Sequence, residues 1–278
     1  MSSEHGMNLK GKIKQAIPDQ VWQAGRDVWD GIKRIKADVN ASLHPLRRES
    51  IQKLRALKDK YQGERCVIIG NGPSLGITDV EKIRNEYTFG MNRIYLAWEE
   101  WGFSTSFFVS VNDLVIEQCA PEIQDLLMPL FLAWRSHQWL EPQANIHYLY
   151  TTYTGPTFAK DVSKRLWEGA TVTYTALQLA YHLGFTTVLL IGVDHNFVSK
   201  GKPNQTVLSE GDDPNHFNPN YFGKGFRWQL PDLETSEIAY KIARQVYQED
   251  GRQIIDATIG GKLDIFPKVD FDRYFHQK

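Results

Sequence analysis

Short hydrophobic runs alternate with helical stretches from residue 65 onward. The run over residues 66–69 is wholly apolar, which is typical of a strand buried on both faces of a sheet. Similar runs recur along the chain and predict further strands over residues 87–91, 106–111, 129–134, 146–150, 187–191 and 253–256.

Helical patterns fill the intervals between these runs. Residues 173–183 place Ala176, Leu177 and Ala180 on one face, and Gly184 follows as a helix stop. Residues 233–250 show a second pattern of this kind. Strands that alternate with helices predict right-handed crossovers. We therefore expect an α/β fold with a doubly wound, mostly parallel, Rossmann-like sheet. The interval over residues 199–231 shows neither pattern and is expected to be irregular.

The first 62 residues have a different character. Apolar residues recur at steps of three and four over residues 21–39, which predicts one amphipathic helix, and a second is expected over residues 49–61. We divide the chain into an N-terminal helical extension, residues 1–62, and an α/β nucleotide-binding domain, residues 63–278. The extension is expected to pack on its own domain or on a second subunit. Trp22 and Trp29 also suit a bilayer surface, and partner binding is a third alternative.

Composition and charge narrow the class of protein. Hydrophobic residues make up 42% and charged residues 23% of the chain, and the formal net charge is -1. No global basic field is available for nucleic acid. No apolar stretch approaches the roughly 18 residues of a membrane-spanning helix, and the first ten residues lack a signal peptide's apolar run. We expect a cytoplasmic protein with two reduced cysteines, Cys66 and Cys119.

The clearest candidate for chemistry is the turn after the first strand, which reads Gly70-Asn71-Gly72-Pro73-Ser74-Leu75. Glycines allow the backbone to approach a ligand closely, and N–H groups at a strand's carboxyl end suit phosphate. The turn lacks the Lys-Ser/Thr of a Walker loop and the third glycine of the dinucleotide fingerprint. It therefore indicates an anion or nucleotide site of another type.

Residues 67–75, together with Leu190-Ile191-Gly192-Val193-Asp194, resemble the MptE-like family, formerly a domain of unknown function. That family includes archaeal 6-hydroxymethylpterin diphosphokinases and the central domain of flagellin-glycosylation accessory factors. The turn is also similar to that of the bacterial sialyltransferases of glycosyltransferase family 42. The resemblance covers roughly residues 65–256 and leaves the N-terminal helices unexplained.

This resemblance implies a nucleotide site and several of its residues. The implied nucleotide-binding residues of the turn are Gly70, Asn71, Gly72, Pro73 and Ser74. Asn92 matches the family's asparagine that faces the nucleotide. Thr171 and Thr173 fall where the sialyltransferases carry Thr-Ser-Gly, although this chain has no glycine there. Hydroxyls at this position can cap a helix and direct its N–H groups toward an anion.

Two acids follow predicted strands. Asp194 comes directly after Gly192 at the end of residues 187–191, and Asp113 follows residues 106–111. An acid at a strand's carboxyl end is placed for a ribose hydroxyl, a proton transfer or a metal. If both strands neighbour the turn, Asp113 and Asp194 could hold Mg²⁺ beside a phosphate. Satisfaction by loop N–H groups is the alternative for Asp194.

The irregular interval contains the expected general base. His216 lies in a polar and aromatic segment, residues 210–222, and an imidazole titrates near operating pH. The related sialyltransferases use a histidine from a comparable late loop. Lys224 and Arg227 follow closely and could clamp a phosphate or an acidic acceptor.

Together these features predict a nucleotide-dependent transferase. We expect glycosyl transfer from a nucleotide-activated, CMP-type sugar to a surface glycan or small-molecule acceptor, with His216 and Asp194 as catalytic residues and no required cofactor. The first alternative is Mg²⁺-dependent diphosphate transfer from ATP to a hydroxymethylpterin. The second is a nucleotide-binding module without catalysis. The protein is expected to form a homo-oligomer and to bind no nucleic acid.

Overall fold

The computed structural model describes residues 39, 41–198 and 201–276. The chain divides into two units, Met1–Arg48 and Glu49–Lys278. The helix expected over residues 21–39, with both of its tryptophans, lies outside the described residues except for Val39. Helix α3, Pro45–Leu57, forms over much of the second expected helix. No helix in the described part of the chain is long and apolar enough to cross a membrane.

The second unit is built on an eight-stranded sheet in which every neighbouring pair is parallel. The strand order is β10-β7-β1-β2-β3-β4-β5-β6. The strands are β1 Arg65–Ile69, β2 Tyr87–Met91, β3 Phe107–Ser110, β4 Leu130–Ala133, β5 Ile146–Thr152, β6 Arg165–Trp167, β7 Thr187–Ile191 and β10 Gln253–Asp256. Each predicted strand forms, and β6 is an addition. The expected α/β fold with a mostly parallel, doubly wound sheet is confirmed.

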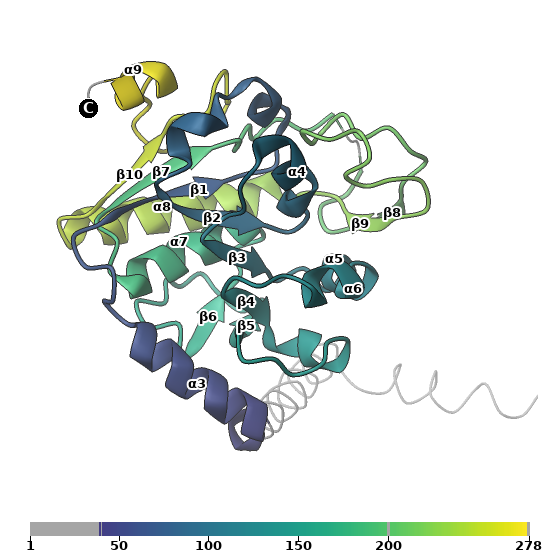
Figure 1. The fold of residues 1–278 in the computed structure, drawn as a ribbon, viewed down its shortest axis with the longest axis vertical. Helices are drawn as coiled ribbons and strands as arrows, with labels where there is room; N and C mark the ends of the chain where they lie inside the picture. Colours follow the sequence, from purple (N-terminus) through teal and green to yellow (C-terminus); the bar gives the residue numbers. More distant parts are fainter. Residues whose placement is uncertain (1–38, 40, 199–200, 277–278) are drawn as a thin grey trace, which may run out of the picture. The chain divides into compact units, whose positions relative to one another are not determined.

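Strand β1 is buried on both faces of the sheet, as the apolar run over residues 66–69 predicts. Cys66 and Ile68 belong to the hydrophobic cluster that includes residues of α7, Val172–Leu183, and of α8, Leu233–Glu249. Val67 and Ile69 point to the opposite face and are equally inaccessible. Helices α7 and α8 contact each other on one side of the sheet (Figure 1). Helix α7 ends at Gly184, which has the left-handed φ of +101° that its sequence position predicts.

Between strands β1 and β7 the order in which the chain adds strands to the sheet reverses. They pair with each other, and the chain runs from β1 toward β2 but from β7 toward β10. Ligands of open parallel sheets bind outside the carboxyl ends of such a strand pair. The Gly70 turn follows β1, and Gly192 and Asp194 follow β7. The predicted opposition of these two motifs is therefore confirmed.

The remaining elements are short. They are α4 Trp98–Trp101, α5 Asp113–Gln118, α6 Ala120–Gln124 and α9 Phe271–His276, with 3-10 turns η1 Pro73–Ile77, η2 Val80–Ile83, η3 Ile94–Ala97 and η4 Trp134–Gln138. The interval over residues 199–231 is not wholly irregular, because β8, Thr206–Leu208, pairs antiparallel with β9, Arg227–Gln229. Neither strand of this hairpin has a buried residue, so no apolar run predicts it.

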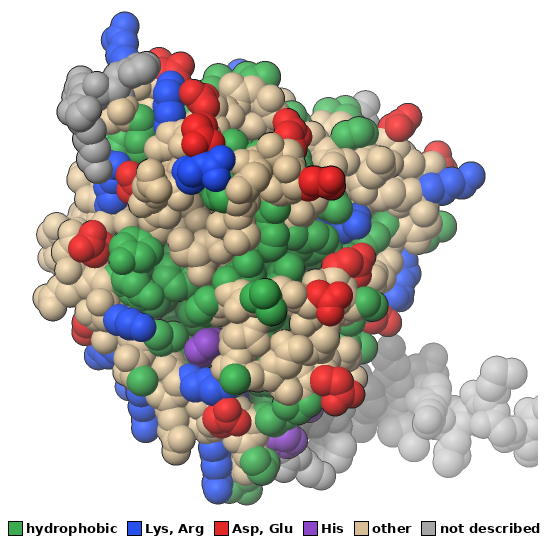
Figure 2. Space-filling view, in the orientation of Figure 1, with side chains coloured by type: hydrophobic (Ala, Val, Ile, Leu, Met, Phe, Trp, Pro, Cys, Tyr) green, Lys and Arg blue, Asp and Glu red, His purple; other side chains and the backbone are tan. Residues whose placement is uncertain are grey.

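Charge is dispersed over the visible surface. Figure 2 shows hydrophobic side chains gathered in the middle of one face, with basic and acidic side chains intermixed around them. A nucleic-acid site needs a contiguous basic stripe. This face has none, which agrees with the formal net charge of -1.

Candidate functional site

A cavity of about 850 Å³ lies at the carboxyl ends of β1, β2, β3 and β7. The N-termini of α7 and α8 and the β8–β9 hairpin also contribute to its wall. The predicted site residues that line it are Gly70, Asn71, Gly72, Asn92, Asp113, Thr171, Thr173, Gly192, Asp194 and His216. Four predicted site residues do not line it, namely Pro73, Ser74, Lys224 and Arg227.

The glycines of the turn are required by the end of β7. The N–H of Gly70 donates to Ile191 O over 2.7 Å, and that of Gly72 donates to Gly192 O over 2.8 Å. A Cβ on Gly70 would lie 2.2 Å from Gly192 O, and one on Gly72 would lie 1.9 Å from Asp194 Oδ2. The Gly192 carbonyl and the Asp194 carboxylate therefore leave no room for a side chain at Gly70 or Gly72, whether or not a ligand is bound.

Asp194 is bound by Ser74. Its Oδ1 accepts from the Ser74 N–H over 3.1 Å, and its Oδ2 accepts from Ser74 Oγ over 2.7 Å. Ser74 is buried beneath the turn. The carboxylate therefore fixes the conformation of the turn, as the alternative of satisfaction by loop donors anticipates. Asp194 also lines the cavity.

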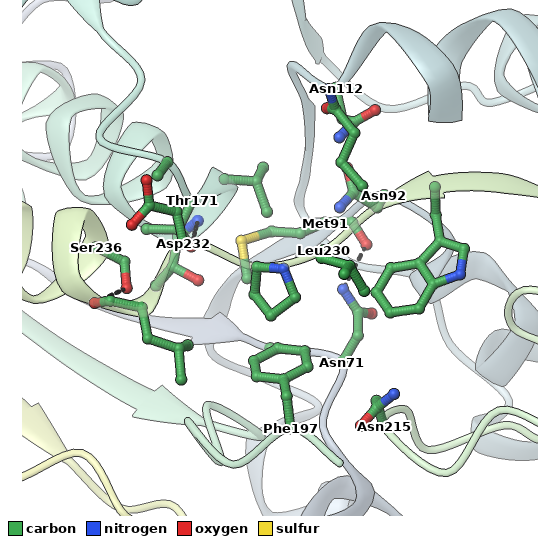
Figure 3. A pocket seen from close by; sticks show the side chains of 18 of the residues that line it. Asn71, Met91, Asn92, Asn112, Thr171, Phe197, Asn215, Leu230, Asp232 and Ser236 are labelled. Carbon is green, nitrogen blue, oxygen red and sulfur yellow. Dashed lines mark hydrogen bonds between the residues drawn. The ribbon is translucent and has the colours of Figure 1, made fainter. Parts of the chain in front are cut away.

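Amide side chains gather on one side of the cavity. Figure 3 shows Asn71, Asn92 and Asn215 on that side and Thr171 and Asp232 on the other. Asn71 Nδ2 donates to Met91 O over 3.1 Å, while its Oδ1 is buried with no protein partner. Asn92 has a left-handed φ of 52°, which asparagine tolerates, and its Oδ1 accepts from Ser110 Oγ. Unsatisfied amide groups of this kind suit the edge of a base or a ribose.

The opposite side is formed by two helix N-termini. Thr171 caps α7, because its Oγ1 accepts from the Thr173 N–H over 3.3 Å. Asp232 caps α8 by accepting from the Thr235 N–H over 3.0 Å. The Thr171 hydroxyl also lies 3.3 Å from the hydroxyl of Tyr240, whose pKa burial raises. Exposed N–H groups at a helix start attract anions, so this side suits a phosphate.

His216 lines the cavity in a held orientation. Its Nδ1 lies 2.7 Å from Asp213 Oδ2, and its ring stacks on that of Tyr221 with centroids 4.0 Å apart. The next residue, Phe217, donates its N–H to Asn71 O over 2.9 Å, which ties this loop to the glycine turn. An imidazole that donates from Nδ1 to a carboxylate keeps a lone pair on Nε2. This arrangement is competent for general base catalysis.

Arg93 holds the same loop from β2. Its Nη1 donates to the backbone carbonyl of Asn220 over 3.1 Å and to that of Tyr221, and its N–H donates to the Tyr221 hydroxyl over 3.3 Å. The guanidinium also lies over the Phe226 ring. The base-bearing loop is therefore anchored to the strand end that carries Asn92.

A second histidine that contacts a carboxylate, His195, lines the cavity beside Asp194. His195 Nε2 lies 3.1 Å from Glu237 Oε1 of α8. Its ring contacts Tyr240 edge-on, with centroids 6.2 Å apart. His195 has a left-handed φ of 53°, an uncommon conformation for a residue other than glycine.

Asp113 and Asp194 do not form a shared metal site. Strands β3 and β7 are three positions apart in the sheet, so their ends are separated by roughly 14 Å. Arg135 Nε contacts both oxygens of Asp113, at 3.1 and 2.8 Å. Mg²⁺ requires its ligands at about 2.1 Å, so one ion cannot bind both carboxylates. The described residues contain no group of three or more His, Cys, Asp or Glu side chains placed to hold a metal.

Arg135 connects Asp113 to a buried acid in the cavity wall. Its Nη2 donates to Glu168 Oε1 over 2.8 Å and to the Tyr153 hydroxyl over 3.0 Å. Burial raises the pKa of the Glu168 carboxyl despite this cation. The guanidinium satisfies both carboxylates, and we assign the cluster to support of the wall.

The expected phosphate clamp lies elsewhere. Arg227 is in β9, where its Nη2 pairs with Glu117 Oε2 over 2.9 Å. Lys224 is exposed in the connection before it. Neither side chain lines the cavity, to which β9 contributes Trp228 and Gln229 instead.

Sequence reasoning missed the partners that orient the site. Asp213, Glu237 and Arg93 each act on a histidine or its loop, and only Arg93 closely follows a predicted strand. Asp213 is separated from His216 by only three positions, so a local Asp-x-x-His pattern was available as a signal. Glu237 and Arg93 contact residues far away in the sequence, and only the fold brings them there.

Comparison with known proteins places the chain in a family. A family model described as "6-hydroxymethylpterin diphosphokinase MptE-like" matches residues 42–200. No curated protein matches the chain. The solved structure of MAf glycosyltransferase from Magnetospirillum magneticum AMB-1 is similar, with a TM-score of 0.47 and 16% identity over 83% of this chain. The chain spans 39% of that protein's length. Because the family model covers more than half of the sequence, the chain belongs to the MptE-like family.

Proposed function

We propose that this protein is a nucleotide-dependent transferase that moves a glycosyl group from a nucleotide-activated, CMP-type sugar to a hydroxyl of a glycan acceptor. One observation carries the proposal. His216, oriented by Asp213 at 2.7 Å, lines the same cavity as the Gly70–Gly72 backbone. The family takes its name from a diphosphokinase, which supports the broader class of transferase.

The chemistry follows from the orientation of the imidazole. Nδ1 donates to Asp213, so Nε2 accepts the proton of an acceptor hydroxyl as that oxygen bonds to the sugar carbon. The bond from the sugar carbon to the donor phosphate breaks, and the electron pair leaves with the phosphate. We assign the start of α7, which Thr171 caps, to stabilisation of that leaving charge. The amide groups of Asn71 and Asn92 are assigned to the nucleoside.

Diphosphate transfer from ATP is the second candidate, and the acidic lining favours it. Asp113, Glu168, Asp194 and Asp232 all line the cavity, and a divalent cation would offset their charge. The specific pair Asp113 and Asp194 does not suit one ion, because Arg135 contacts one and Ser74 the other. No step is therefore derived through a metal, and glycosyl transfer remains the preferred reaction.

A ligand panel tests the proposal directly. Melting temperature is measured with CMP, CDP, UDP, GDP, AMP and ATP, each with and without Mg²⁺. A nucleotide at a hundred times its Kd should add about 2.7 kcal/mol to the free energy of unfolding. A shift by CMP that survives EDTA supports the glycosyl-transfer proposal. Turnover that EDTA abolishes would favour the diphosphokinase alternative, and no shift by any nucleotide would refute both.

A catalytic measurement separates an enzyme from a binding module. The His216→Ala variant is compared with wild type for release of nucleotide from the donor sugar nucleotide. We expect a loss of about 10²- to 10⁴-fold in kcat with little change in nucleotide affinity. Equal turnover in the variant would remove His216 as the base and favour the non-catalytic alternative.

A further inference from the structure

The cavity has an unusual charge balance for a phosphate site. Four carboxylates line it, whereas no Lys or Arg occurs among its described lining residues. His195 and His216 are the only basic side chains among the described residues that line it. A donor phosphate therefore has few sources of compensating charge beyond backbone N–H groups.

The two histidines have the same design but different positions. Each uses one ring nitrogen on a carboxylate, and the other nitrogen has no hydrogen-bond partner among the described residues. His216 belongs to the loop tied to Asn71, on the amide side of the cavity. His195 follows Asp194 directly at the end of β7. Its side chain is 10% exposed, so it is held firmly within the wall.

A ring contact connects His195 to one element expected to bind an anion, and its position in the sequence connects it to the other. Through the neighbouring Asp194 it adjoins Ser74 and the glycine turn. Its ring packs against Tyr240, whose hydroxyl contacts Thr171 at the start of α7. The His195 ring therefore lies beside a residue that contacts the start of α7, and its backbone directly follows the acid that holds the glycine turn.

We infer that His195, held by Glu237, is the cationic residue that binds the donor phosphate, while His216 serves as the base. This inference rests on the proposed function and deepens it. Nε2 carries a proton when it donates to Glu237. For Nδ1 to donate to phosphate at the same time, the ring must carry a second proton and be an imidazolium. Glu237 is then its counter-ion. Lys241, 3.9 Å from Glu237, and Asp194 are the other charged groups beside this pair.

A phosphate-selective binding experiment tests the inference. Calorimetry measures the Kd of CMP and of cytidine, and of the uridine, adenosine and guanosine pairs, for wild type and His195→Gln. We expect His195→Gln to weaken the monophosphate by about 10- to 100-fold, which corresponds to one charge-assisted hydrogen bond, and to leave the nucleoside unchanged. Glu237→Gln should show the same selectivity with a smaller loss.

Two controls fix the interpretation. Glu234→Gln alters an exposed acid in the first turn of α8, three residues before Glu237, and should retain wild-type affinity for both ligands. His216→Gln should retain monophosphate affinity while losing turnover. The melting temperature of each variant without ligand establishes that it is folded.

The outcomes separate the two proposals. Equal weakening of CMP and cytidine by His195→Gln, or no weakening of either, overturns the phosphate role alone. If wild-type protein binds none of the four monophosphates, the proposed function and this inference are both overturned. Selective loss of the monophosphate supports both.

Discussion

Ser74 donates two hydrogen bonds to Asp194, from its N–H over 3.1 Å and from its hydroxyl over 2.7 Å. The two residues are 120 positions apart in the sequence. These bonds join the motif after β1 to the motif after β7 at the reversal point of the sheet. The conformation of the glycine turn and the position of the Asp194 carboxylate therefore depend on each other, and a change to either should disturb both.

Replacement of Gly72 by alanine tests this coupling. A Cβ at Gly72 would lie 1.9 Å from Asp194 Oδ2, so the carboxylate must move and its bonds to Ser74 must weaken. We expect Gly72→Ala to lose about 1–3 kcal/mol of unfolding free energy, typical of an overpacked site. Nucleotide stabilisation should fall with it. Urea denaturation and the thermal-shift panel measure the two effects.

Gly76 provides the matched control. It lies in the same 3-10 segment, and a Cβ there meets nothing within 4 Å. Gly76→Ala should keep both stability and nucleotide binding. If Gly72→Ala behaved like Gly76→Ala, the packing of the turn against Asp194 would be excluded as the reason for the glycine.

The sequence predicted the parts of the site that depend on local patterns. Buried apolar runs located β1 and β7, and the residues that follow them, Gly70 and Asp194, had to meet once the strands paired. The pairing of His195 with Glu237 depends instead on the angle at which α8 crosses the end of the sheet. The pattern of apolar residues along the sequence does not predict that angle. The β8–β9 pairing was not predicted, because neither strand has a buried residue.

Asp213 should matter to catalysis through the tautomer of His216. An asparagine at this position offers an N–H₂ group to Nδ1, which favours the tautomer with its proton on Nε2 and removes the basic lone pair. We expect Asp213→Asn to lower kcat by about 10²- to 10⁴-fold with a nearly unchanged KM. Donor turnover at saturating nucleotide measures it.

Asp212→Asn is the control for this change. Asp212 is exposed and has a left-handed φ of 46°, which asparagine adopts readily. Wild-type kcat is expected there. A comparable loss of kcat in both variants would indicate general damage to the loop instead of a tautomer effect.

Arg93 should restrain the loop that carries His216. Its side chain donates to the carbonyl groups of Asn220 and Tyr221. Loss of one such charge-assisted bond increases the fraction of molecules in which this loop is detached from the protein by about tenfold or more. Arg93→Ala should therefore accelerate tryptic cleavage after Lys224 by that factor and reduce turnover. Arg84→Ala removes an exposed arginine that pairs with Glu81 and bonds the carbonyls of Trp101 and Gly102, none of them in this loop, and should leave both rates unchanged. Unaltered cleavage in Arg93→Ala would contradict the restraint.

A pH dependence of stability is expected from His147. Burial lowers the pKa of this imidazole from its ordinary value of 6.5, and its Nδ1 contacts Asn145 O at 2.9 Å. The unfolded chain therefore takes up the proton at a higher pH than the folded protein does. The contribution of His147 to stability is fully present above pH 6.5 and is lost as the pH falls through the lowered folded pKa.

The size and origin of that loss can be measured by urea denaturation between pH 5 and 8. One additional proton bound by the unfolded state costs at most about 1.4 kcal/mol per pH unit. His147→Gln keeps an N–H donor for Asn145 O but cannot titrate, so its stability should fall less steeply than that of wild type below pH 6.5. Above pH 7 the two curves should run parallel, offset by the lost contact with the Phe131 ring. Parallel curves over the whole range would show that His147 stays neutral or charged alike in both states, and the effect of its burial would be refuted.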